Sequence, residues 1–179
     1  MGGGLPGVRA GAERAEAGAV KARGSGGAIR VAPFTVARID EVLAIEKASF
    51  SDPWSREMFR SELEVGGGTY ARIAERGKTL VGYLLAVMII DEAHLGNLAV
   101  VPSERRSGVG QRLLDDLLET ARERGVARVT LEVRESNQIA RKFYYRNEFI
   151  DVAMRKNYYR NPVEDAIVML RSLREGSRA

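Results

Sequence analysis

The stretch NLAVVPSERRSGVGQ at Asn97–Gln111 decides the fold of this chain. Its first residues are mostly apolar and stop at Pro102, which is typical of a β-strand. A basic, glycine-bearing loop follows, and the next residues repeat apolar positions every three or four residues, as a helix with one buried face does. The stretch therefore predicts a strand, a loop and a helix in direct succession.

The loop has the chemistry of an anion-binding site. The first amides of a helix lack internal partners and carry the positive end of the helix dipole, so they attract phosphate. Gly108 and Gly110 permit close approach because they have no side chain, and Arg105 and Arg106 add positive charge. Leu113 replaces the third glycine of a dinucleotide fingerprint, and no Gly-Lys-Ser/Thr is present. A glycine-containing turn before a surface helix is the alternative interpretation.

Patterns along the rest of the chain predict a mixed α/β sheet. Helical spacing of apolar residues favours helices, and short apolar runs bounded by turn residues favour strands. The expected helices are 36–50, 55–63, 109–125 and 137–147, with Ser55 as the cap of the second. The expected strands are 69–74, 80–90, 93–101, 126–133, 150–158 and 165–170. This order is not that of a strictly alternating, doubly wound sheet.

The length of 179 residues fits one domain with a substantial core. Residues 1–28 contain nine of the 19 glycines and little that could bury an apolar face, so they predict a disordered tail. A transit peptide is the alternative, although Glu13 and Glu16 and the lack of an apolar stretch count against it. The domain is expected at residues 29–173, followed by a flexible C-terminus at 174–179.

Charge and cysteine content narrow the function classes. The net charge of +4 comes from basic residues spread along the chain, whereas a nucleic-acid binder concentrates them in a stripe. The chain has no cysteine, which excludes disulfides, zinc–thiolate sites and a cysteine nucleophile. The longest apolar run, at residues 80–90, is too short to span a bilayer. We expect a soluble, cytoplasmic protein without a metal, without direct nucleic-acid binding and without membrane contact.

From these segments the chain is similar to the GNAT superfamily of N-acetyltransferases, and within it to the RimI type, the ribosomal-protein-alanine N-acetyltransferases. The loop at residues 105–110 resembles the acetyl-CoA pyrophosphate loop of that superfamily. Three further segments narrow the resemblance, namely NLAV at 97–100, LEVRESN at 131–137, and RKNYY at 155–159 followed by EDA at 164–166. The similarity runs from about residue 29 to 173 and implies the acyl-CoA N-acyltransferase fold, with about seven strands and about four helices.

The resemblance implies a role for each matching residue. Glu132 falls on the general base and Tyr144 on the general acid of the family. Tyr158 and Tyr159 match a tyrosine pair near the acceptor peptide, and Trp54 is either a wall of the substrate site or a core residue. The cofactor acetyl-CoA is expected to contact Leu98, Ala99, Val100, Arg106, Ser107, Gly108, Val109, Gly110, Gln111 and Asn137.

The implied reaction is direct transfer of acetyl from acetyl-CoA to the N-terminal amine of a ribosomal protein that begins with alanine. An α-amine has a pKa near 8 and a lysine side chain one near 10.4, so removing the lysine proton costs roughly 3 kcal/mol more at neutral pH. Acetylation of lysine or of small amines is the alternative on the same fold. A third hypothesis is a subunit or sensor that binds the cofactor without catalysing a reaction. The presence of both Glu132 and Tyr144 argues against it.

Some residues depart from the family pattern or keep a second interpretation. Gly96 stands where a bulky apolar residue is common. The helix that carries Tyr144 lacks the glycine that usually follows it in the family. Asn147 or Glu148 therefore has to adopt the left-handed backbone conformation that ends the helix. His94, the single histidine, is a second candidate base. The alternative is that it is a residue at the edge of the sheet without a catalytic role.

Overall fold

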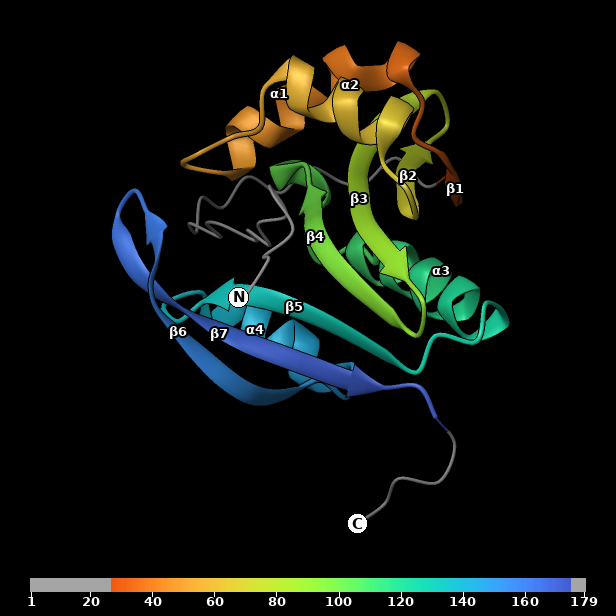
Figure 1. Cartoon of the computed structure of the whole chain (residues 1–179). Helices are drawn as coiled ribbons and strands as arrows, with labels where there is room; N and C mark the ends of the chain where they lie inside the picture. The colour runs from red at the N-terminus through yellow and green to blue at the C-terminus, as the bar shows by residue number, and fades with distance from the viewer. Residues whose placement is uncertain (1–26, 175–179) are drawn as a thin grey trace.

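The computed structural model describes residues 27–174, which form one seven-stranded sheet with helices on its faces (Figure 1). The strand order is β1-β2-β3-β4-β5-β7-β6. All neighbours are antiparallel except β4 and β5, which are parallel. The strands are β1 (Ile29–Pro33), β2 (Thr69–Arg76), β3 (Thr79–Ile89), β4 (Glu92–Val100), β5 (Arg128–Arg134), β6 (Ile150–Arg160) and β7 (Val163–Ser172). The α-helices are α1 (Ile39–Ser49), α2 (Arg56–Val65), α3 (Val109–Glu123) and α4 (Gln138–Arg146), with 3-10 turns at Val36–Arg38 and Pro102–Glu104.

The predicted mixed sheet and the order of the elements are confirmed, with one strand added. Strand β1 was not predicted, because its five residues carry no turn signal of their own and end in Pro33. It forms by antiparallel pairing with β2, which supplies the partner that its sequence cannot indicate. The tail predicted from composition and the flexible C-terminus lie outside the described residues, apart from residues 27, 28 and 174.

Two apolar clusters hold the helices to opposite faces of the sheet. On one face, α3 and α4 pack against strands β2 to β5 and β7, with Leu113, Leu114 and Leu117 fully buried. On the other face, α1 and α2 cover β2, β3 and part of β4 through Phe59 and Tyr83. The α1–α2 layer lies over the N-terminal half of the sheet in Figure 1 and does not extend over β5, β7 and β6.

Two local predictions about helix ends are confirmed. Ser55 caps α2, where its hydroxyl oxygen accepts a hydrogen bond of 3.2 Å from the amide of Met58. Glu148, which follows α4, has a φ of 62° and takes the left-handed position that a glycine fills in the family. The sequence determines both because each depends on residues next to it in the chain.

A buried carboxylate links α1 to the middle of the sheet. Glu46 is 1% exposed, and it accepts hydrogen bonds from the amide of Trp54, at 2.9 Å, and from the hydroxyl of Tyr83. Asn97 of β4 extends this group through its amide to the same hydroxyl. Burial raises the pKa of the Glu46 carboxyl to about 7, although both hydrogen bonds favour the ionised form.

The raised pKa of Glu46 predicts that stability falls as pH rises. The unfolded chain has a glutamate pKa near 4.3, so the folded state binds this proton more tightly. The resulting stabilisation of the folded state is complete below about pH 4 and is lost as the pH rises through about 7. Between pH 5 and 8 we expect about 2–3 kcal/mol less unfolding free energy from this group. Urea unfolding at several pH values should show this slope in the wild type and a flatter one in Glu46→Gln. The exposed-site variant Glu64→Gln should keep the wild-type slope, and an equal slope in Glu46→Gln would contradict the assignment.

Candidate active site

Strands β4 and β5 separate partway along their length. Their parallel pairing joins Glu92–Leu95 to Arg128–Leu131 and goes no further in the described chain. The register of β3 shifts opposite Gly96, which places this residue at a β-bulge of β4. Figure 1 shows β4 and β5 diverging along their length. The last residues of β4, 97–100, therefore pair with β3 on one side only, and their other edge can hydrogen-bond an extended, amide-bearing ligand.

The basic loop connects the end of β4 to the start of α3. Arg106 and Gly108 both have positive φ, 63° and 91°, and Gly108 is the residue that precedes the helix. The first hydrogen bond of α3 runs from the amide of Arg112 to the carbonyl of Gly108 at 2.9 Å. The amides of residues 109–111 therefore have no acceptor in the helix, as a phosphate site requires. Arg105 ties the loop to β4 by donating from Nε to the Val100 carbonyl at 3.3 Å.

Three of the predicted cofactor residues already have side-chain partners. The Gln111 side chain exchanges two hydrogen bonds with that of Asn147, at 2.7 and 3.1 Å, which leaves the backbone N–H of Gln111 for a ligand. The Ser107 hydroxyl donates to the Glu104 carbonyl at 2.7 Å. Asn137 caps α4 by accepting from the Ala140 amide at 3.1 Å, which uses its oxygen and leaves its NH₂ group as a donor.

Glu132 lies on β5 at the point where β4 departs. Its side chain is 3% exposed, so it is not the solvated strand carboxylate that such a pattern could also indicate. Its Oε2 lies 3.0 Å from His94 Nε2, and its Oε1 lies 3.2 Å from an Arg155 nitrogen. Oε2 receives no aligned hydrogen bond from the described residues. A buried carboxylate oxygen in this state can accept a proton from an arriving amine.

His94 has a different place from the one expected. It lies on β4 in the interior of the sheet, between Val87 of β3 and Thr130 of β5, so the edge reading is wrong. The pairing of β4 with β5 brings it to Glu132, which is 38 positions later in the chain. Only the tertiary structure places these two residues together.

Tyr144 lies on α4 in the core between two other rings. Its ring centre is 5.2 Å from that of Phe143 and 5.5 Å from that of Phe149. Burial raises the pKa of its hydroxyl, so the phenol keeps its proton at neutral pH. Its hydroxyl makes no hydrogen bond to another residue of the 27–174 range. Burial and Tyr158 raise the pKa of the Tyr159 hydroxyl and Arg134 lowers it; Glu132 and Tyr144 raise it further, which places both groups near this one side chain.

The tyrosine pair and the tryptophan occupy different environments. Tyr158 is half-buried and Tyr159 is 5% exposed, with their rings edge to face at 5.2 Å. The guanidinium of Arg134 lies 4.1 Å from the Tyr159 ring centre. Trp54 is 6% exposed and packs 5.2 Å from Phe59 in the cluster beneath α1 and α2, as the core reading expects.

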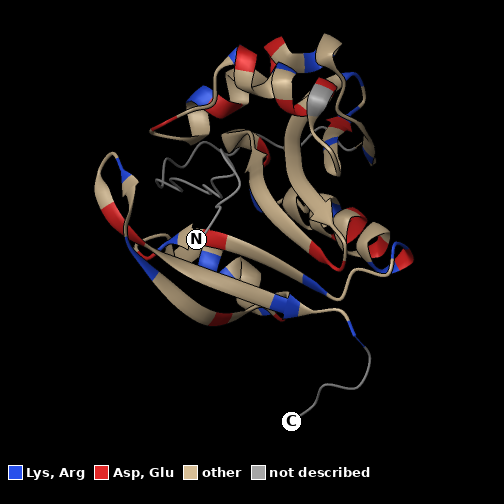
Figure 2. Ribbon diagram, viewed as in Figure 1, with Lys and Arg blue, Asp and Glu red and all other residues tan. Residues whose placement is uncertain are grey.

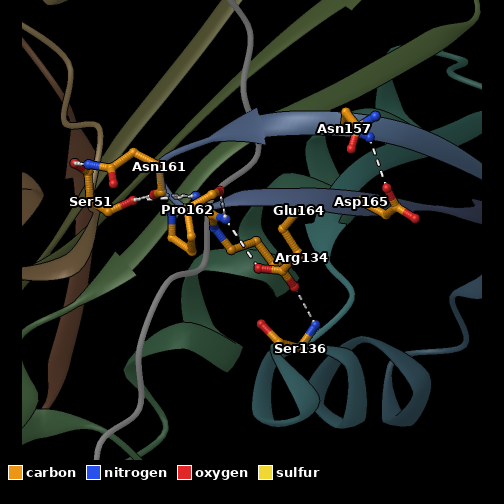
Figure 3. A network of polar contacts seen from close by, with 8 residues as sticks. All are labelled: Ser51, Arg134, Ser136, Asn157, Asn161, Pro162, Glu164 and Asp165. Carbon is orange, nitrogen blue, oxygen red and sulfur yellow. Dashed lines mark hydrogen bonds and ion pairs between the residues drawn. The ribbon is translucent and has the colours of Figure 1, made fainter.

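A polar network that the sequence did not indicate surrounds Arg134 at the end of β5 (Figure 3). Arg134, the last residue of β5, donates to the carbonyls of Asn161 and Pro162 at 2.9 and 3.1 Å and to Glu164 at 3.1 Å. It also donates to the Ser51 hydroxyl at 3.3 Å. The network thereby fastens the β6–β7 turn to the segment between α1 and α2. The one signal in the sequence was an arginine at the end of an apolar strand. Its partners could not be predicted, because they are 27 to 83 positions away in the chain.

Other kinds of site find no support in the described residues. Residues 27–174 contain no group of three or more metal-ligating side chains. Within the same range, no helix is long and apolar enough to cross a bilayer. Figure 2 shows basic and acidic residues interspersed along the ribbon of helices and strands, unlike the single basic stripe of a nucleic-acid binder.

Comparisons with known proteins identify the family and the fold. Residues 39–149 match the acetyltransferase (GNAT) family. A relative from Escherichia coli (strain K12), the [ribosomal protein bS18]-alanine N-acetyltransferase, is 36% identical over 129 residues, which cover 70% of this chain and 84% of the relative. The crystal structure of the ribosomal-protein-S18-alanine N-acetyltransferase from Escherichia coli superimposes with a TM-score of 0.76 and 29% identity, over 85% of this chain and 99% of that one. Arabidopsis thaliana NAA60 in complex with acetyl-CoA shares the fold, with a TM-score of 0.73 and 18% identity over 82% and 99% of the two chains.

Proposed function

The chain belongs to the acetyltransferase (GNAT) family, and we propose that it transfers acetyl from acetyl-CoA to the N-terminal alanine of ribosomal protein bS18. The enzyme class, an acetyl-CoA-dependent N-acetyltransferase, follows from the family. The acceptor is inferred from the activity for which the Escherichia coli relative is named. A ribosomal protein as acceptor would place the reaction in the cytoplasm, where ribosomes assemble.

The observation that carries the proposal is the opening between β4 and β5, with Glu132 buried at its base. The one-sided edge of Leu98, Ala99 and Val100 fits the peptide-like pantetheine arm, because an arm with amides can continue the ladder. The free amides of Val109, Gly110 and Gln111 suit the pyrophosphate. Arg106, Ser107 and Gly108 complete this loop, and the NH₂ group of Asn137 is a further donor to the cofactor.

Glu132 is the proposed base. It accepts a proton from the α-amine, whose nitrogen then attacks the thioester carbonyl carbon, and the carbon–sulfur bond breaks. Tyr144 is the proposed acid that gives its proton to the departing sulfur, which its buried and un-ionised phenol suits. Tyr158 and Tyr159 are proposed to bound the acceptor peptide, since phenols combine apolar area with a hydrogen bond.

A set of three matched peptides tests the acceptor. One carries the first residues of bS18 with a free alanine and one internal lysine, the second has the same sequence with a blocked N-terminus, and the third has a free N-terminus without lysine. We expect the free termini to react on the order of 100-fold faster than the blocked peptide, since a neutral amine is that much more abundant at the terminus. Mass spectrometry locates the acetyl group. Equal rates for free and blocked peptides would assign lysine as the acceptor.

A charge-reversal variant tests whether the basic loop binds the cofactor. Arg106 is exposed on the loop, where Arg106→Glu places a negative charge beside the proposed diphosphate. Calorimetry with acetyl-CoA should show weaker binding, and the peptide assay should show a higher KM for acetyl-CoA. Unchanged affinity would remove the loop from the cofactor site.

A further inference from the structure

A line of polar contacts runs from Glu132 to the protein surface. His94 Nε2 lies 3.0 Å from Glu132 Oε2, close enough for proton transfer after a small rotation of the ring, although the two atoms are not aligned as a hydrogen bond. His94 Nδ1 lies 3.2 Å from Thr130 Oγ1. Thr130 Oγ1 donates to Glu92 Oε1 at 2.9 Å, and the other oxygen of Glu92 pairs with Arg128. The Glu92 side chain is 38% exposed, so the line ends in solvent.

The hydroxyl in the middle of this line determines the tautomer of neutral His94. A threonine hydroxyl has one proton, and an ionised carboxylate only accepts, so Thr130 gives its proton to Glu92. The bond between Thr130 and His94 is then donated by Nδ1. Because a neutral imidazole has a single N–H, Nε2 is left as an acceptor, and it is the nitrogen that faces Glu132.

We propose that His94 takes over, through Glu132, the proton that the acceptor amine loses, and passes it toward Glu92. The inference rests on the proposed role of Glu132 as base. The amine N–H bond breaks and Glu132 Oε2 binds the proton, which moves to His94 Nε2. The Nδ1 proton moves to Thr130 Oγ1, whose own proton moves to Glu92. One proton enters and one leaves at the exposed end, and the carboxylate of Glu132 is ionised again. Before the next turnover the 23% exposed ring exchanges its Nε2 proton for one on Nδ1 through water, and the Thr130 hydroxyl turns back to Glu92.

The other charged groups around Glu132 are compatible with this direction. From β6, a nitrogen of Arg155 lies 3.2 Å from Oε1, so this positive charge pairs with the oxygen that does not face His94. Tyr159, also on β6, is held un-ionised by burial and adds no charge. On β7, the residue opposite Glu132 is the apolar Val168. His94 is thus the group in contact with Glu132 that can both accept a proton and release another.

Nitrogen-15 NMR of the imidazole tests the line of contacts directly, because the full chain has a single histidine. At a pH where titration shows the ring to be neutral, we expect the Nδ1–H tautomer in the wild type and in Thr130→Ser. In Thr130→Val the acceptor for Nδ1 is lost, so the Nε2–H tautomer should become populated and donate to Glu132. An Nε2–H tautomer in the wild type, or no change in Thr130→Val, would overturn the proposal.

Kinetics of His94 variants test the proton transfer itself. We expect His94→Gln to lower kcat by about 10-fold, as for one member of a hydrogen-bonded network, with both KM values unchanged because His94 is not placed against either substrate. In His94→Ala, imidazole added to the buffer should restore part of kcat, since the 23% exposed site can admit it. A full-rate His94→Gln, or a loss that imidazole does not restore, counts against His94 as a proton carrier. Failure of the wild type to acetylate any peptide would remove the proposed function, and the tautomer would still decide on the line of contacts.

Discussion

Glu132→Gln is expected to lower kcat by about 100- to 10,000-fold, the range for loss of a general base. The amide has nearly the shape of the carboxylate but cannot take the proton of the amine. The dissociation constant for acetyl-CoA should stay the same, because Glu132 lies on β5 and the proposed phosphate contacts lie at the start of α3. Single-turnover rates and calorimetry measure the two quantities separately.

The neighbouring Glu135 provides the matched control for this substitution. It is exposed just beyond the end of β5, so Glu135→Gln makes the same chemical change away from the opening and should leave kcat within about twofold. Both variants should unfold at similar urea concentrations, which separates chemistry from stability. A fully active Glu132→Gln protein would show that another group takes the proton.

Arg134→Met is expected to lower the unfolding free energy by about 3–5 kcal/mol, the cost of removing one partner from a buried ion pair. Arg134 is 5% exposed and donates to two carbonyls as well as to Glu164. Methionine fills much of the volume but supplies no donor, so the carbonyls of Asn161 and Pro162 lose their charged partner. Urea unfolding gives the loss directly.

The control for Arg134 is another arginine near the same turn. Arg160 is exposed at the end of β6, and Arg160→Met should change stability by less than about 0.5 kcal/mol. Arg134→Lys keeps the charge but not the planar set of donors, and it should fall between the two. If Arg134→Met and Arg160→Met unfolded at the same urea concentration, the network of Figure 3 would contribute nothing to stability.

Much of the fold was readable from the sequence because the signals were local. The apolar stripe of α3, the Ser55 cap and the left-handed residue after α4 each depend on neighbours within a few positions. The strand ends were less well placed, and β7 extends two residues beyond its prediction at either end, because an antiparallel partner prolongs it. Strand β1 was missed for the same reason, since its pairing with β2 creates it.

Glu46 shows where local reading falls short within a predicted element. It follows the buried positions Ile39 and Val42 at helical spacing and is itself buried on the same helix, α1. That its charge is compensated by the Trp54 amide and the Tyr83 hydroxyl could not be predicted, because Tyr83 arrives from a strand 37 positions later. The raised pKa follows from that burial and not from the residue type.

By itself the sequence determined the element order, which follows from periodicity. It also predicted an anion site at the start of α3, from glycine at two positions and from backbone amides that every helix start leaves unpaired. The candidate base and acid came from the resemblance to the GNAT superfamily. The tertiary structure alone decided that Glu132 is buried, that His94 lies 3.0 Å from it and that Arg134 joins two distant turns. Burial and long-range contact arise only when β4 and β5 pair and then separate, which no single segment of the chain encodes.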